Sequence, residues 1–165
     1  MATIKIPYIG TIDSSSVEEY YYAVMSLNNI EVQIDLNFEA ITIDVKRLEI
    51  VKHFIENIRI HDLNNKKYLH QDFNKHDEPT STYIGHHLEE LGTDDLHDLV
   101  GSSSKTSDHP KLLLNKLYLM RVGLYPESET EFAVFDYSVG KELTNYVVAI
   151  NTDDNGNISS LAMES

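Results

Sequence analysis

Apolar and polar residues alternate strictly along residues 30–39, the clearest structural signal in the chain. The apolar positions are Ile30, Val32, Ile34, Leu36 and Phe38. A period of two predicts a strand with one face buried and the other in water. Residues 18–25, rich in tyrosine and valine, predict a strand just before it. Asn28 and Asn29 lie between the two and predict a hairpin turn, because asparagine tolerates a positive φ.

The period changes after Asp44. Apolar residues then recur at steps of three and four, at Leu48, Val51, Phe54, Ile55 and Ile58. This spacing predicts a helix with one apolar stripe, and Asp44 is placed to cap its first turn. Residues 64–82 are polar and contain Pro79, so they predict mainly a loop. Shorter helices are expected further on, at residues 83–91, at residues 93–100 and from about Pro110.

Strand patterns return in the last third of the chain. Alternation and β-forming residues predict strands at residues 118–124, 132–137, 146–150 and 158–163. The sequence Asp154-Asn155-Gly156-Asn157 predicts the hairpin turn between the last two. Near the N-terminus, residues 4–9 predict a first strand, which Pro7 would confine to a sheet edge.

The order of these elements predicts the fold class. Strands fall within residues 1–40, a helical segment covers residues 44–116, and strands follow within residues 117–165. Blocks of strands and helices are typical of α+β proteins. We therefore expect a single domain, residues 1–165, built as a two-layer sandwich. It would have a mostly antiparallel sheet of about six to seven strands, with two or three helices on one face and the other face at least partly open.

Composition and charge narrow the function classes. The chain of 165 residues has 27 acidic and 13 basic residues and a net charge of −14. Nucleic acids and anionic membranes usually bind basic patches, so neither is an expected partner. Two interpretations of the charge stay open: it attracts a basic protein, or it only keeps the chain in solution.

Cysteine is absent, which excludes disulfides and thiolate metal sites. The N-terminal residues carry no long apolar core typical of a signal peptide, and no apolar run reaches the length of a membrane span. We therefore expect a cytoplasmic protein. No cofactor motif or catalytic motif was identified, so we expect no cofactor and no enzymatic activity.

The polar face of residues 30–39 is the candidate binding surface. Glu31, Asp35 and Glu39 would point to one side, since each lies four residues from the next along the strand. Asp136, on a later strand, would add a further acid. An acidic platform of this kind would dock a basic protein steered by charge; the alternative is an ordinary solvated sheet face.

Histidines are concentrated in the helical segment, where seven of the eight lie between His61 and His109. Imidazoles and carboxylates can bind zinc or a similar ion. The candidate ligands would be His86, His87, Glu90 and His97, although their spacing matches no established site. The alternative function is therefore a metal-dependent hydrolase that uses this His-rich segment.

Four stretches of the chain carry a family resemblance. They are residues 6–10 (IPYIG), 31–38 (EVQIDLNF), 121–126 (RVGLYP), and 135–140 (FDYSVG) through 151–153 (NTD). With these phrases the chain resembles a bacterial family of small acidic cytoplasmic proteins, a domain of unknown function. The resemblance implies a two-layer α/β sandwich and brings no activity and no functional residues.

The leading hypothesis is a non-enzymatic protein-binding domain that meets a basic protein on its acidic sheet face. By analogy, small acidic proteins of this kind are similar to immunity proteins, which neutralise secreted toxins that are often basic nucleases. The sequence names neither the partner nor the oligomeric state.

Overall fold

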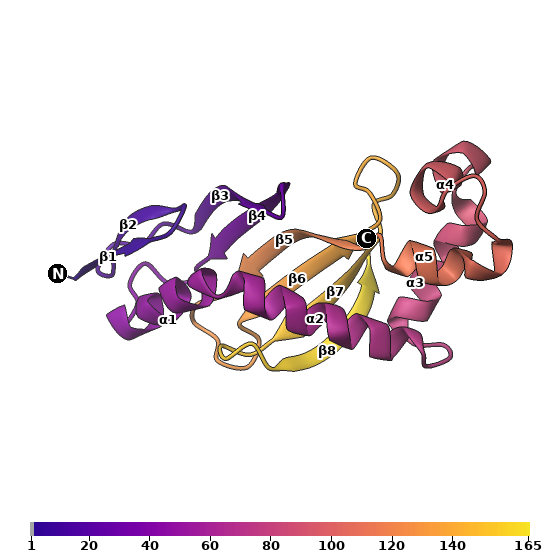
Figure 1. The fold of residues 1–165 in the computed structure, drawn as a ribbon. Coiled ribbons are helices and arrows are strands. Elements are labelled where there is room, and N and C mark those ends of the chain that lie inside the picture. Colours follow the sequence, from indigo (N-terminus) through magenta and orange to yellow (C-terminus); the bar gives the residue numbers. More distant parts are fainter. Residues whose placement is uncertain (1) are drawn as a thin grey trace.

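The computed structural model describes residues 2–165, and it contains a six-stranded sheet, a separate two-stranded hairpin and five α-helices in that part of the chain (Figure 1). The strands are β1 (Thr3–Ile6), β2 (Gly10–Asp13), β3 (Tyr20–Leu27), β4 (Ile30–Asn37), β5 (Tyr118–Leu124), β6 (Ala133–Ser138), β7 (Val147–Thr152) and β8 (Ile158–Glu164). The helices are α1 (Val45–Glu56), α2 (Ile58–Phe73), α3 (Pro79–Glu90), α4 (Thr93–Val100) and α5 (His109–Leu114), with a short 3₁₀ turn (Thr106–Asp108) before α5.

The large sheet has the order β3-β4-β5-β6-β7-β8, which confirms the α+β class. Every neighbouring pair is antiparallel except β4 and β5. That pair is parallel because the whole helical segment connects the two strands, and parallel neighbours need such a crossover. The predicted hairpin between β3 and β4 is confirmed, with positive φ angles of 53° at Asn28 and 65° at Asn29.

The N-terminal strand prediction is wrong in its bounds. Residues 4–9 do not form one edge strand of the large sheet, because the chain turns at Pro7 and Tyr8, and Tyr8 adopts a φ of 68°. The two sides of this turn pair as β1 and β2. Ile6 and Ile12 from the hairpin are buried, and β1 packs against α1.

Helices α1 and α2 follow one another across one face of the sheet (Figure 1). As predicted, the Asp44 carboxylate caps α1 by accepting from the Lys46 backbone N–H at 3.0 Å. Phe54 of α1 packs against Phe132 and Phe135, with ring centroids 5.0 and 5.9 Å away. This contact joins the helix layer to the centre of the sheet.

The predicted loop at residues 64–82 is wrong, since α2 continues to Phe73 and α3 already begins at Pro79. The reason is that α2 turns polar residues toward the core. Asp62, Asn65 and Asp72 are buried beside Leu69, so the helix lacks the apolar stripe that would have predicted it. Helices α3, α4 and α5 gather at one end of the sheet rather than over its face (Figure 1).

The turn between β7 and β8 forms as predicted. The Asp153 carboxylate accepts from the backbone N–H groups of Asn155 and Asn157, each at 2.9 Å. Gly156 has a φ of 84°, and a Cβ atom there would collide with the ring of His61. Glycine therefore allows this turn to pack against α2.

No helix in residues 2–165 combines the length and the apolar character that a membrane span requires.

Candidate functional site

The face of the sheet opposite α1 and α2, here called the open face, is covered by no described helix (Figure 1). Side chains alternate along β4, so the buried Val32, Ile34 and Leu36 face the helices and the residues between them face outward. Gln33, Asp35 and Asn37 thus belong to the open face.

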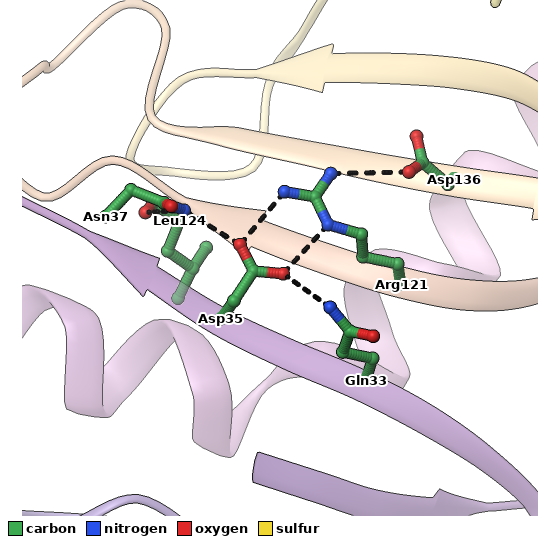
Figure 2. Close-up of polar contacts among 6 residues, drawn as sticks. All are labelled: Gln33, Asp35, Asn37, Arg121, Leu124 and Asp136. Atoms are coloured by element: carbon green, nitrogen blue, oxygen red, sulfur yellow. Dashed lines mark hydrogen bonds and ion pairs between the residues drawn. The ribbon is translucent and has the colours of Figure 1, made fainter. Parts of the chain in front are cut away.

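Asp35 and Arg121 bind one another on the open face (Figure 2). The Arg121 Nε donates to Asp35 Oδ2 at 2.8 Å, and Nη2 donates to Oδ1 at 2.9 Å. The two residues come from β4 and β5, which lie side by side as the parallel pair. A two-point contact of this kind fixes the guanidinium plane as well as its position.

Two amide side chains complete the surroundings of Asp35. Gln33 Nε2 donates to Oδ2 at 3.2 Å, and Asn37 Nδ2 donates to Oδ1 at 2.8 Å (Figure 2). Both lie two residues from Asp35 on the same strand, so the alternation of β4 places them on its face. The Asp35 side chain is only 1% exposed. Asp35 is therefore a buried group, so the expectation that it lies on the water-exposed side of the strand is wrong, whereas a role in binding a partner stays a prediction.

Asp136 of β6 is the third member of the cluster. Arg121 Nη1 donates to Asp136 Oδ2 at 3.3 Å, and the Asp136 side chain is 15% exposed. Burial raises the pKa of Asp136 above its ordinary value, against the opposing attraction of Arg121, and the charges of Asp35 and Glu164 add to the rise. Asp136 thus adds a largely buried acid to this face, with one carboxylate oxygen bonded to Arg121, and its role in binding a partner stays a prediction.

The charge of Arg121 is held firmly by its neighbours. Burial on its own would lower the pKa of Arg121, but hydrogen bonds with Asp35 and Tyr125 and the charges of Asp35 and Asp136 raise it above its ordinary value. One cation thus lies between two acidic side chains. We call Arg121, Asp35 and Asp136 the arginine cluster.

Gly123 makes room for the arginine cluster. It pairs with Asp35 in the parallel ladder, and a Cβ atom built on it would lie 2.8 Å from Arg121 Cζ. Such a separation is well inside van der Waals contact, so a side chain at this position would displace the guanidinium. The register of β5 also shifts between Leu119 and Arg121, which is a local bulge.

Two hollows flank the arginine cluster, and Arg121 lines both. The first, of about 430 Å³, has Tyr22, Val24 and Met120 among its lining residues. The second, of about 420 Å³, lies on the other side and includes Asp136 and Glu164. The open face therefore contains two hollows whose walls combine apolar side chains with acidic and basic ones, the basic ones being Arg121 and Lys141.

Aromatic residues and acids surround these hollows. Tyr20 and Tyr22 are 50% and 56% exposed, whereas Tyr21 between them packs edge-on against Phe38 on the opposite face. Of the four predicted partner-binding acids, Glu31 and Glu39 are exposed. Sequence reasoning missed Arg121 as a site residue; the available signal was that it is one of three arginines and the only one within a predicted strand.

The four candidate metal ligands do not form one cluster, although the rings of His86 and His87 lie edge-on with their centroids 5.0 Å apart. His87 is buried: its Nδ1 lies 2.7 Å from the Tyr83 carbonyl oxygen, to which it donates, and its Nε2 lies 2.8 Å from Thr144 Oγ1. Burial lowers the pKa of His87, which the Tyr83 contact opposes and the charge of His86 reinforces. His86 packs edge-on against Tyr146 instead.

Within residues 2–165, no three side chains of histidine, aspartate or glutamate gather in a geometry suited to a metal ion. Glu90 is exposed and His97 is partly exposed. Both nitrogens of His87 are engaged by the protein, so this ring is a structural link between α3 and the loop before β7.

Comparisons of the chain with protein-family models, with curated proteins and with solved structures give no match. The resemblance to a bacterial family of unknown function stays a prediction. The fold and the open face define the class at the level of an α+β protein with a one-sided helical layer.

Proposed function

We propose that the protein is a protein-binding domain that docks a basic partner on its open face. The observation that carries the proposal is the open face itself, where exposed tyrosines and two hollows surround a fixed arginine cluster. Aromatic residues are enriched at protein interfaces, because they bury much surface at a small cost in side-chain entropy.

Charge supports a basic partner. The guanidinium at the centre is already engaged by Asp35 and Asp136, so it offers little attraction to an anion. Glu31, Glu39 and Glu164 are exposed around it. Together with the net charge of −14, these acids would steer a basic protein toward this face and raise its association rate. A basic toxin nuclease, bound in the manner of an immunity protein, is one partner of this chemistry.

The arginine cluster would serve as a rigid, preorganised part of the binding surface. Because its members are pinned by several hydrogen bonds, little side-chain freedom is lost there on binding, which lowers the entropic cost of association. The hydrolase alternative remains a prediction that no observed geometry favours.

Affinity capture with two matched triple variants would test the proposal. The test variant reverses the open-face acids, as Glu31→Lys, Glu39→Lys and Glu164→Lys. The control reverses exposed acids on helices α1 and α3, as Glu49→Lys, Glu56→Lys and Glu90→Lys. Both change the net charge equally, so only the location of the charge differs. Asp35 is left unchanged, since its replacement would disturb the fold.

We expect the native protein and the control to retain the same basic protein from a lysate of the source cells, and the test variant to lose it. A photo-cross-linking residue at Tyr22 should join to that protein, whereas one at the exposed Leu63 of α2 should not. Equal loss in both triple variants, or cross-linking only from position 63, would contradict docking on the open face.

A further inference from the structure

Strand β3 is an unprotected edge of the large sheet. It is the first strand in the order β3-β4-β5-β6-β7-β8 and pairs with β4 alone. Its eight residues, Tyr20–Leu27, contain no charge, no proline and no glycine, and all eight pair with β4 in unbroken register. Natural sheets usually blunt a free edge with charge, proline, a bulge or a covering element.

The register of β3 with β4 identifies which backbone N–H and C=O groups of β3 point away from the sheet. The Glu19 carbonyl accepts from the Phe38 backbone N–H at 2.9 Å. Hydrogen-bonded pairs alternate along an antiparallel ladder, so the odd-numbered residues of β3 bond to β4. The N–H and C=O groups of the even-numbered residues then point away from the sheet. These residues, whose side chains are all exposed, are Tyr20, Tyr22, Val24 and Ser26.

The opposite edge of the sheet is built differently. Strand β8 ends in the charged Glu164, its register with β7 shifts between Asn151 and Thr152, and α3 packs against it. These are devices that oppose edge-to-edge pairing. The contrast isolates β3 as the edge available for another strand.

We propose that β3 pairs antiparallel with β3 of a second copy of this chain, joining the two sheets across a two-fold axis. Such an axis, perpendicular to the sheet, keeps the open faces on the same side, so opposed residues must both be even-numbered or both odd-numbered. A register centred on Ala23 meets this condition. It places Tyr22 opposite Val24 of the second copy and Tyr20 opposite Ser26, and these are the residues with outward backbone groups.

Charge at the ends of β3 fits the same register. Glu19 is exposed and precedes the strand, whereas Arg59 of α2 donates to the Asn28 side chain at 3.0 Å, just after the strand. Antiparallel pairing brings Glu19 of one copy toward Leu27, Asn28 and Arg59 of the other, twice per dimer. Each strand is itself uncharged, so no like charges face each other at the centre of the contact.

A dimer of this kind would be weak, because one pair of edge strands forms a small interface. The inference does not rest on the proposed function, since it uses the edge of the sheet and not its face. The dimer would, however, extend the open face into a surface twice as long.

Sedimentation velocity from micromolar to near-millimolar concentration would test the pairing. We expect the native chain to shift from monomer to dimer and Val24→Pro to stay monomeric, because proline removes an outward donor without removing a bond to β4. Val24→Thr is the control and should dimerise as the native chain does. Circular dichroism and thermal unfolding would establish that the proline variant is folded.

A charge exchange gives a second test that does not depend on proline. Glu19→Lys and Arg59→Glu should each weaken dimerisation about tenfold, since each disrupts two ion pairs per dimer, and the double variant should restore it. A native chain that stays monomeric throughout, or a dimer that folded Val24→Pro and the two charge variants leave unchanged, would overturn the proposal.

Discussion

Buried polar side chains lie on both faces of the large sheet, but the two faces differ in how completely these side chains are hydrogen-bonded. On the open face, Asp35 receives two hydrogen bonds from Arg121 and two from neighbouring amides. On the helix-covered face, the Tyr137 hydroxyl donates to Asp62 at 2.7 Å, yet both side-chain polar atoms of the adjacent, fully buried Asn65 lack a partner among the described residues.

This difference in hydrogen bonding indicates which buried polar side chains are held most rigidly. A fully paired buried cluster holds each side chain in one position, whereas an unpaired buried amide costs stability without ordering anything. The fully paired cluster around Asp35 lies on the face that is open to a partner. On the helix-covered face, Asp62 is paired with Tyr137 and Lys66 while Asn65 is not paired. That face also contains apolar packing, as in the contact of Phe54 with Phe132 and Phe135.

The largest expected effect comes from removing the cation of the arginine cluster. Arg121→Met leaves the buried Asp35 carboxylate without its principal partner, so we expect a loss of about 3 kcal/mol in the free energy of unfolding. Urea denaturation would measure it. Replacing Asp35 as well, as Asp35→Leu, should recover much of the loss, because no unpaired charge then remains.

Lys141→Met serves as the control. Lys141 lines the hollow of about 430 Å³ that Arg121 also lines, but Lys141 is exposed. Its substitution should change the free energy of unfolding by no more than about 0.5 kcal/mol. If Arg121→Met behaves like this control, the cluster contributes nothing, and the contrast between the two faces is wrong.

A smaller loss is expected when the space of the arginine cluster is filled. Gly123→Ala places a methyl group against the guanidinium and should destabilise the fold by about 1–3 kcal/mol through overpacking. In the Arg121→Met background the same substitution should cost clearly less, because methionine can move aside. Strictly additive losses in a double-mutant cycle would show that Gly123 acts independently of Arg121.

Acidification should act first on two histidines of the helical segment, His61 of α2 and His87 of α3. Burial lowers the pKa of both His61 and His87 below the ordinary value of 6.5, so the unfolded chain binds more protons than the folded one in that range. Stability is therefore complete above about pH 6.5 and falls as the pH drops through the window below it. The slope is at most about 1.4 kcal/mol per pH unit for each histidine.

Chemical denaturation between pH 5 and 7.5, repeated with His87→Gln, would measure this effect. The variant should show a shallower slope than the native chain. An unchanged slope would mean that His87 binds protons equally in both states.

The smallest expected effect is a gain in stability. Asn65→Leu removes two unpaired buried polar atoms and keeps a similar volume, so we expect stabilisation of about 1 kcal/mol. Thermal unfolding would detect it. Destabilisation would indicate that the amide is bonded to the nearby Tyr137 hydroxyl. Burial, followed by Asp62, raises the pKa of that hydroxyl well above its ordinary value, and Asn65 opposes the rise.

Much of the fold could be predicted from the sequence, because the local period of apolar residues indicates many of its strands and helices. The strand at residues 30–37 and the helix at residues 45–56 show clear periods of two and 3.6. Helix α2 was missed because Asp62, Asn65 and Asp72 occupy positions that usually hold apolar residues. Its buried face is recognisable only when the sheet that it covers is known.

The candidate site was predicted only in part, because its two main residues are far apart in the sequence. The strand face was identified, but the alternation of β4 cannot show that Asp35 is buried by Arg121, which lies 86 positions away. Their contact depends on the parallel pairing of β4 and β5, and no local signal specifies which strands become neighbours.

That parallel pair also bears on the order of events during folding. Strands β5, β6, β7 and β8 form consecutive antiparallel pairs, and β3 and β4 form a hairpin, so both units can assemble from contacts close in sequence. Pairing of β4 with β5 instead requires closure of the long chain segment between them. The entropic cost of this closure delays the pairing. We expect Asp35 and Arg121 to meet late, so that Arg121→Met mainly accelerates unfolding and leaves the refolding rate nearly unchanged.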